Sequence, residues 1–291
     1  MALYDGDGTD AGRFARLLIY GETKVGKSIL GTTMPGPRVL VATEENAVLA
    51  THTSLAEVPR AYGAGDTTRA AARVLRLTEW ADVWEALARI ERSGQTYRSV
   101  IFDSMSGLID LLLTDVRNDV SGKHRREVLT QEDWGIINTR LQSFRVAVNR
   151  LPLHVLYIAH LRSGTDGTAA TRQRPATPAR PGGPDIPGRQ VARFCADCSA
   201  VLIAQATPGP RGTRYQLQTR PVGDLVAGFN VAASRVAPAE TPDLHVFLAR
   251  LGGGYLPPAE QAQVFAAVPP IETLPSQDGV NSADSASTSD F

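Results

Sequence analysis

Eight residues near the start of the chain combine two glycines with a lysine and a serine. They read Gly21-Glu22-Thr23-Lys24-Val25-Gly26-Lys27-Ser28, and Ile29 follows them. Glycines at these positions let backbone N–H groups turn toward an anion at the positive end of a following helix. Lys27 would then reach the β- and γ-phosphates of a nucleotide, and the Ser28 hydroxyl would ligate Mg²⁺. The pattern predicts a binding loop for ATP and Mg²⁺, against the alternative of an ordinary surface turn.

A carboxylate follows one of the apolar runs that have the composition of a buried strand. Asp103 stands directly after residues 100–102, which read Val-Ile-Phe. In phosphoryl-transfer enzymes an acid at such a strand end holds Mg²⁺. We expect Asp103 and Ser28 to share the metal, and the alternative is an aspartate that only closes a turn. Ser104 is expected either to hydrogen-bond to the metal-bound water or to cap a local helix.

Other polar groups stand at the ends of two further expected strands. Glu44 and Glu45 follow residues 39–42, and His160 follows residues 155–159. Glu44 is a candidate general base for the water that attacks the γ-phosphate, and the alternative is a pair of solvated acids that begin a helix. His160 is either a sensor that passes the presence of the γ-phosphate to the next loop or a histidine satisfied by a backbone carbonyl. The predicted catalytic residues are Lys27, Glu44 and His160.

Arginine-rich segments provide the expected contact with nucleic acid. Residues 163–188 are rich in Gly, Pro, Thr, Ala and Arg, contain no aromatic residue, and are predicted to form a flexible loop. Such segments neutralise phosphates without reading base sequence, whereas the alternative is a solvated linker. The candidate DNA-binding residues are Arg162, Arg172, Arg174, Arg180 and Arg189, and a second basic cluster for the same surface comprises Arg117, Lys123, Arg125 and Arg126.

Two cysteines, Cys195 and Cys198, are the only ones in the chain. A structural zinc site needs four ligands, and no second pair of cysteines or histidines stands at a suitable spacing. We therefore expect both to be reduced thiols that lie as small buried residues in a helix.

The elements that must position these groups alternate between apolar β-rich runs and helical patterns. This alternation favours an α/β fold with a mainly parallel sheet flanked by helices. An antiparallel extension is expected near the C-terminal end, across Pro208-Gly209-Pro210. The expected strands are residues 17–20, 39–42, 100–102 and 155–159, followed by the antiparallel pair 201–204 and 215–218.

Two helices have clear boundaries in the sequence. Thr130 and Asp133 predict a capping box at the start of a helix. Its single apolar stripe comprises Ile137, Leu141, Phe144, Val148 and Leu151. A last short helix is expected after Thr241, with Pro242 at its first position and its end at residues 252–254.

Composition and charge limit the class of protein. The 291 residues carry 30 Lys and Arg against 30 Asp and Glu, so no global field attracts the chain to nucleic acid or membrane. No apolar run approaches the ~20 residues of a membrane span, and the N-terminus does not have the pattern of a secretion signal. We expect a cytoplasmic protein without a membrane partner. Its expected parts are a flexible N-terminus (1–13), one core domain (14–265) and a disordered acidic tail (266–291).

Together these pieces resemble phage nucleotide-binding ATPases with a minimal RecA-like core, a group that includes Sak-type single-strand annealing recombinases. The resemblance covers about residues 14–252. Its most specific motifs are Gln131-Glu132-Asp133-Trp134-Gly135 and Gly183-Pro184-Asp185-Ile186-Pro187-Gly188, and the other matching pieces are the glycine loop, Ala42-Thr43-Glu44, and residues 100–104 and 155–162.

The resemblance implies a RecA-like P-loop fold, with Glu44 as the catalytic glutamate and His160 at the start of a DNA-binding loop. It also implies ATP-dependent action on single-stranded DNA, with ATP bound between subunits of a homo-oligomeric ring or filament. A single-strand-binding protein is a further candidate partner. Where relatives often carry a basic stretch, this chain reads Ala227-Gly228-Phe229-Asn230, which leaves Arg220 and Arg235 as candidate trans-acting cations.

The leading hypothesis is therefore a phage recombination ATPase that binds single-stranded DNA and hydrolyses ATP at a subunit interface. Two alternatives stay open. A small-molecule or nucleotide kinase would use residues 163–188 as a lid. A non-hydrolysing adaptor would use ATP only to set its oligomeric state on DNA.

Overall fold

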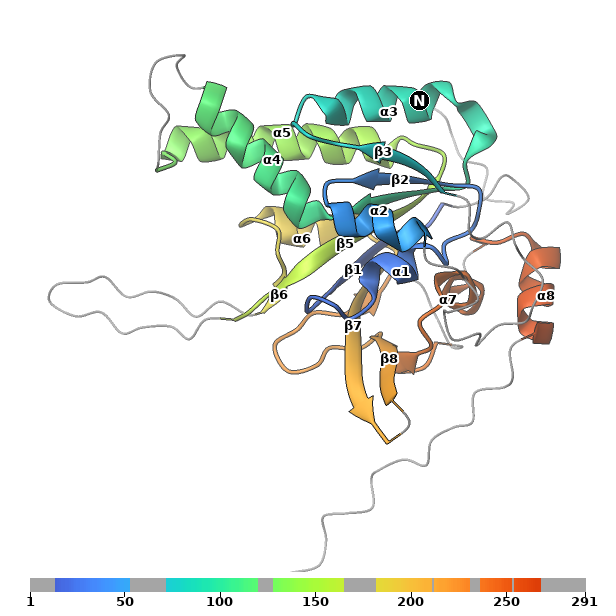
Figure 1. Cartoon of the computed structure of the whole chain (residues 1–291). Helices are drawn as coiled ribbons and strands as arrows, with labels where there is room; N and C mark the ends of the chain where they lie inside the picture. Colours follow the sequence, from blue (N-terminus) through green and yellow to red (C-terminus); the bar gives the residue numbers. More distant parts are fainter. Residues whose placement is uncertain are drawn as a thin grey trace, which may run out of the picture.

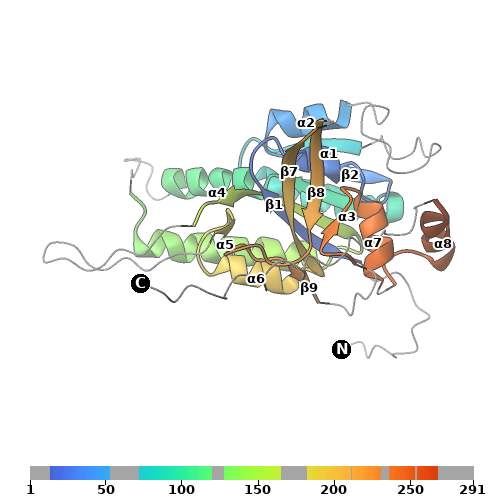
Figure 2. The ribbon, with the colours of Figure 1, turned by 90° about the horizontal axis from the view of Figure 1, so that it is seen from below.

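The structure, a computed structural model, describes residues 14–52, 72–119, 128–164, 182–210, 212–230, 236–252 and 254–267. One mixed sheet runs through its centre and carries helices on both faces (Figures 1 and 2). The strand order is β10-β8-β7-β1-β5-β4-β2-β3. The parallel strands are β1 (Arg16–Gly21), β2 (Arg38–Ala42), β3 (Ala72–Arg76), β4 (Ser99–Asp103), β5 (His154–Arg162) and β7 (Ala200–Gly209). The predicted α/β class with a mainly parallel sheet is confirmed.

The predicted antiparallel extension lies beyond β7. β8 (Gly212–Gln218) pairs with β7, and β10 (Ala239–Glu240) pairs with β8, both in antiparallel register. Two short strands lie off this path, because β6 (Gly183–Pro184) pairs with β5 and β9 (Gly228–Phe229) pairs with β7. β7 is longer than predicted and includes Pro208 and Gly209, which the sequence places in the turn.

Side chains of the central strands alternate between two buried clusters, one on each face of the sheet. Leu18 and Tyr20 of β1 lie in the first cluster, and Leu17 and Ile19 lie in the second. The first cluster packs against α3 (Asp82–Arg92), α4 (Met105–Asp119), α5 (Gln131–Asn149) and α6 (Gln190–Asp197). The second packs against α1 (Lys27–Gly31), α2 (Glu45–His52), α7 (Leu244–Leu251) and α8 (Pro258–Ala267). Burial on both faces explains why these strands read as near-continuous apolar runs.

Helix α5 begins and packs as the sequence predicts. The Asp133 N–H donates to Thr130 Oγ1 at 3.3 Å, and the Thr130 N–H donates to the Asp133 carboxylate at 2.7 Å, which completes the capping box. The predicted stripe is buried, and the Phe144 ring meets the rings of Phe102 and Trp80 edge to face. The helix therefore packs against β4, the strand that ends at Asp103.

Two helix ends differ from the prediction. Asp243 caps α7, because its carboxylate accepts a hydrogen bond from the Val246 N–H at 3.0 Å. Pro242 therefore precedes the helix instead of occupying its first position, and α8 follows α7. Cys195 lies in α6, whereas Cys198 is the residue that ends it. Burial raises the pKa of both thiols.

The expected loop 163–188 is shorter at its C-terminal end. β6 pairs with β5, and Ile186 is fully buried in the first cluster. Residues 1–13 and 268–291, which include the expected N-terminus and nearly all of the acidic tail, lie outside the described residues. Within the described ranges, no helix combines the length and the apolar character needed to cross a bilayer.

Candidate nucleotide-binding site

The glycine loop connects β1 to α1 at the carboxyl end of a central strand, the context that a phosphate-binding loop requires. Lys24 and Gly26 have φ values of 64° and 82°, in the left-handed region, which turns successive N–H groups of the loop inward. Gly21 has no room for a side chain, because a Cβ there would lie 2.4 Å from the carbonyl oxygen of Ala204. Both glycines are therefore needed for the shape of the loop.

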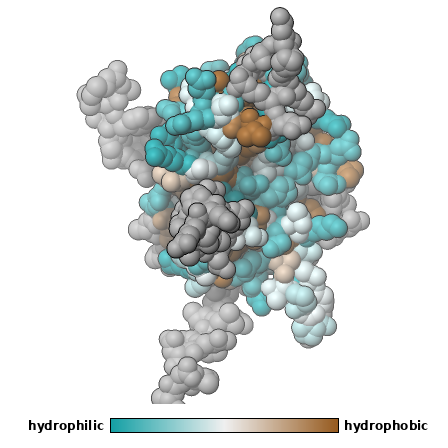
Figure 3. All heavy atoms as spheres, turned by 90° about the vertical axis from the view of Figure 1, so that its left-hand side faces the viewer, coloured by the Kyte–Doolittle hydropathy of each residue, from teal (hydrophilic) through white to brown (hydrophobic). Residues whose placement is uncertain are grey.

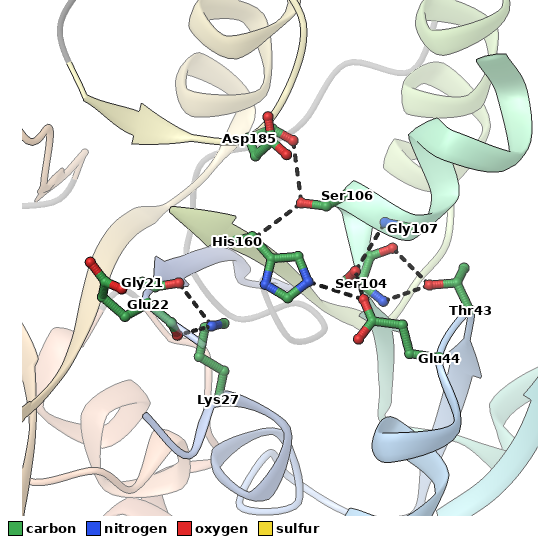
Figure 4. Close-up of polar contacts among 10 residues, drawn as sticks. All are labelled: Gly21, Glu22, Lys27, Thr43, Glu44, Ser104, Ser106, Gly107, His160 and Asp185. Atoms are coloured by element: carbon green, nitrogen blue, oxygen red, sulfur yellow. Dashed lines mark hydrogen bonds and ion pairs between the residues drawn. The ribbon is translucent and has the colours of Figure 1, made fainter. Parts of the chain in front are cut away.

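Lys27 lies folded against its own loop and is 7% exposed. Its Nζ donates to the carbonyl oxygens of Gly21 at 2.8 Å and Glu22 at 2.5 Å (Figure 4). Burial lowers the pKa of Lys27, although the charge of Asp103 opposes this shift. A triphosphate in the loop would give this buried ammonium an anionic partner in place of two carbonyls, as the predicted role requires.

Asp103 lies beside the loop and is almost fully buried. The Ser28 hydroxyl lies close enough to its carboxylate to favour the charged form, and within the described residues the buried Oδ2 has no hydrogen-bond partner. Burial raises the pKa of Asp103 to about 6, and the nearby Ser28 hydroxyl and the Lys27 charge offset only part of this effect. A hydroxyl beside an unpartnered carboxylate oxygen offers the hard oxygen ligands that Mg²⁺ prefers. Ser28 and Asp103 thus fit the shared metal that the sequence predicts.

Glu44 follows β2 and receives hydrogen bonds from two sides (Figure 4). Ser104 Oγ donates to Glu44 Oε1 at 2.5 Å, and His160 Nε2 lies 3.1 Å from the same oxygen. Burial acts to raise the pKa of Glu44, but the hydrogen bonds from Ser104 and His160 and the charges of His160 and Lys27 outweigh it and lower the pKa. Glu44 is therefore anionic at neutral pH, the form that a general base needs.

His160 lies between the phosphate loop and Glu44 because β5 lies between β1 and β4 in the sheet. It stands opposite Gly21 in the β1–β5 register, and within the described residues its ring hydrogen-bonds to the Glu44 carboxylate and to no backbone carbonyl. β5 continues to Arg162, so the histidine does not end its strand as predicted. The backbone N–H of His160 donates to Ser106 Oγ at 3.1 Å, and this hydroxyl donates to the backbone carbonyl of Asp185 at 3.4 Å (Figure 4).

Residues 13–181, more than half of the chain, match the protein family described as AAA domain. The chain belongs to the AAA-domain family. The site described above lies within the matched residues. The sheet flanked by helices is accordingly a P-loop ATPase fold, and the chain is an ATPase of this AAA type.

Two solved structures have some similarity to this AAA domain. The flagellar accessory protein FlaH from Methanocaldococcus jannaschii is 12% identical, with 80% of this chain and 86% of that chain covered and a TM-score of 0.37. An ATPase from the type III secretion system of pathogenic bacteria is 11% identical, with 66% of this chain and 52% of that chain covered and a TM-score of 0.41. No curated protein matches the sequence.

A cleft of about 1130 Å³ opens over the phosphate loop of the AAA domain. Lys27, Glu44, Asp103 and His160 line it, so the cleft unites the predicted catalytic and metal-binding residues. Sequence reasoning missed the opposite walls, which come from α2, β8 and the turn before α7: Asn46, Leu49, Tyr215 and Thr241–Asp243. Nothing in the types or spacing of these residues identifies them as cleft residues. The antiparallel pairing of β8 with β7, and of β10 with β8, brings β8 and the start of α7 beside the loop.

The contacts of Ser104 and Glu45 bear on two alternatives that the sequence leaves open. Ser104 Oγ accepts a hydrogen bond from the Gly107 N–H at 3.0 Å, so it caps α4 and also holds Glu44. Its N–H donates to Thr43 Oγ1 at 2.9 Å, which fixes the start of α4 to the end of β2. Glu45 is an exposed acid that begins α2 and pairs with Arg76 on the edge strand at 2.9 Å, so it lies outside the site.

Only the ends of the arginine-rich segment are described. Arg162 donates to the Ile186 carbonyl at 3.1 Å and thereby joins the two sides of its base, and Arg189 is exposed before α6. Asp185, also at this base, and Asp110 are acidic neighbours. The pKa of Asp110 is raised, first by burial and then by the charges of Asp185 and Glu44. The predicted DNA-binding residues Arg172, Arg174 and Arg180 lie outside the described residues, as do Lys123, Arg125 and Arg126 of the second cluster.

Arg220, one of the two candidate trans-acting cations, does not line the cleft over the phosphate loop. The Arg220 guanidinium stacks over the Phe229 ring, 5.0 Å from its centroid. Arg235 lies outside the described residues. Arg117 of the second basic cluster is half-buried in α4.

Proposed function

We propose that this AAA domain is an ATP-dependent, single-stranded-DNA-binding ATPase of the phage recombination or annealing type. It binds ATP with Mg²⁺ between subunits of a homo-oligomer and couples hydrolysis to DNA. One observation carries the proposal: His160 joins the carboxylate of Glu44 to β5, the strand from which the arginine-rich segment departs.

The hydrolytic part follows from the residues around the cleft. The loop N–H groups and Lys27 bind the phosphates, and Ser28 with Asp103 would hold Mg²⁺, which neutralises charge on the transferred phosphoryl group. Glu44, anionic and fixed by two hydrogen bonds, accepts the proton of the attacking water. A carboxylate of this kind suits attack by water better than transfer to a second substrate, which favours an ATPase over a kinase.

The coupling part follows from the hydrogen bonds beyond Glu44. His160 is two residues from Arg162, and its N–H is bonded to Ser106, which contacts the carbonyl of Asp185. Both sides of the base of the arginine-rich segment therefore connect, through Ser106, to the backbone of the residue whose ring contacts Glu44. A γ-phosphate that hydrogen-bonds to His160 would weaken the bond between His160 and Glu44 and shift the backbone at the start of the arginine-rich segment. Such a shift is a local switch of the kind that orders a segment.

The surface around the base of the arginine-rich segment is suited to a polar partner. The side of the molecule on which β6 lies is predominantly hydrophilic in its described part (Figure 3). Arg162 and Arg189 stand at the base itself. We propose that Arg172, Arg174 and Arg180 complete the contact with DNA phosphates, with an affinity that falls steeply as salt rises.

The direct test measures phosphate release and DNA binding by the full chain. We expect ATP with Mg²⁺ to promote binding of an unstructured single-stranded oligonucleotide, and the oligonucleotide to accelerate ATP hydrolysis. Transfer of phosphate to a nucleoside monophosphate would instead identify the kinase. DNA annealing that survives in Glu44→Gln but not in Lys27→Ala would identify the non-hydrolysing adaptor. The proposal fails if single-stranded DNA neither binds with ATP nor changes the hydrolysis rate.

The role of His160 has a separate test. His160→Ala should keep ATP binding and DNA-free hydrolysis within a few-fold of the wild type, but lose the acceleration by DNA. His160→Gln, which can still donate a hydrogen bond to Glu44, should recover part of that acceleration. A histidine with only a structural role would give variants that respond to DNA as the wild type does.

A further inference from the structure

The hairpin of β7 and β8 lies beside the phosphate loop and α1 (Figure 2). Leu217 of β8 is fully buried in the cluster that contains Leu30 of α1. Tyr215 stands two residues earlier and therefore projects from the same face of the strand. Its ring reaches the loop itself, since a Cβ on Gly26 would lie 3.6 Å from Tyr215 Cδ1. An aromatic ring thus covers the glycine that precedes Lys27.

Tyr215 is not a core residue, although its neighbour Leu217 is. It is 39% exposed, and it lines the cleft of about 1130 Å³ together with Lys27 and Asp103. The loop holds the phosphates, so the rest of a nucleotide must extend into this cleft between the ring and the residues before α7. A partly exposed aromatic side chain at such a wall gains favourable contact when a flat ligand covers it.

We propose that Tyr215 binds the nucleoside part of ATP by packing its ring against the base and ribose. The inference rests on the proposed binding of nucleotide at the glycine loop, but not on any action on DNA. Stacking tolerates every base, because every base has a π-face. Tyr215 therefore makes the site prefer nucleoside triphosphates over inorganic polyphosphate without distinguishing adenine from guanine.

The experiment compares three probes on the full chain by calorimetric titration with Mg²⁺: the β,γ-imido analogues of ATP and GTP, and tripolyphosphate. Tyr215→Ala should weaken the binding of both nucleotides roughly 5- to 150-fold, the range that corresponds to loss of one base–aromatic stack. Its affinity for tripolyphosphate should stay within about twofold of the wild type, which also shows that the loop is folded. Tyr215→Phe should bind all three probes as the wild type does, because the ring makes the contact.

A matched control comes from the other face of the same hairpin. Thr207 of β7 stands opposite Arg214, one position out of step with Tyr215, and it is exposed outside the cleft. Thr207→Ala should leave the affinity for every probe unchanged. The inference is wrong if Tyr215→Ala binds nucleotides as the wild type does, or if it loses nucleotides and tripolyphosphate equally. Failure of the wild type to bind any probe, or binding unaffected by Lys27→Ala, would instead overturn the proposed nucleotide site.

Discussion

Replacing Asp103 by asparagine should make the nucleotide-free protein more stable while abolishing Mg²⁺-dependent hydrolysis. Burial raises the pKa of this carboxyl from 3.8 to about 6, so the folded protein binds the proton more tightly than the unfolded chain. Stability therefore falls as pH rises from about 4 to about 6, and the full penalty is present above that range. A shift of roughly two pKa units corresponds to about 3 kcal/mol. Asparagine removes the buried charge and with it this penalty.

The assay is urea denaturation of the wild type and Asp103→Asn at pH 5, 6.5 and 8, without nucleotide and with a chelator present. We expect the variant to be more stable by up to about 3 kcal/mol at pH 8. The advantage should shrink toward pH 5, where much of the folded wild type is protonated. In a domain of this size the gain at pH 8 is equivalent to roughly 5–10 °C in the melting temperature.

Two results would refute this reasoning. A variant no more stable than the wild type at pH 8 would mean that the carboxylate is already compensated in the folded protein. A stability difference that does not change with pH would mean that the effect comes from packing and not from the buried charge. In a separate assay with ATP and Mg²⁺ and without chelator, phosphate release by Asp103→Asn must fall to background if Asp103 holds the metal.

Four further substitutions test the site and the fold. Glu44→Gln should lower the hydrolysis rate about 10²- to 10⁴-fold and leave the affinity for ATP analogues within a few-fold, by phosphate release and titration; equal losses in both would assign Glu44 to binding. Ser104→Ala should lower DNA-free hydrolysis by up to about 100-fold, because Glu44 loses the partner that fixes its position; an unchanged rate would remove Ser104 from the site. Phe144→Ala should lower the free energy of unfolding by about 3–5 kcal/mol in urea, since its ring fills the core beneath β4. Thr130→Ala should lower it by only about 1 kcal/mol through loss of the cap, and a loss as large as that of Phe144→Ala would contradict the capping account.

The sequence predicted the central strands well because burial on both faces gives them uninterrupted apolar runs. The edge strand β3 was missed for the corresponding reason: it reads Ala-Arg-Val-Leu-Arg, and its arginines are exposed. Strand order was not predictable from periodicity, since β5 lies between β1 and β4 although β2, β3 and β4 come first along the chain. Only this order brings His160 next to Glu44, which stands 116 positions earlier.

The candidate site likewise contains residues that local patterns predict and residues that only the tertiary structure brings together. Local patterns identified the glycine loop, Asp103 and Glu44 as candidates, because each lies within a few consecutive residues at the end of an apolar strand. Tyr215 was missed because its position depends on which element the β7–β8 hairpin packs against, and no local pattern contains that information. The roles of Ser104 were left open for a similar reason, since only the structure shows that one hydroxyl caps α4 and also contacts Glu44.

The two partners of Glu44 are not equivalent, and in the proposed function their difference gives hydrolysis a route by which it responds to a ligand of the arginine-rich segment. Ser104 is fixed by the cap of α4 and by its bond to Thr43, so it holds Glu44 to the rigid part of the domain. His160 lies on the strand that leads to the segment, and within the described residues its buried Nδ1 has no hydrogen-bond partner. Movement of β5 can therefore alter one hydrogen bond of the general base while the other keeps it in place. On this view His160 adjusts the rate in response to the ligand, whereas Ser104 supports the DNA-free rate.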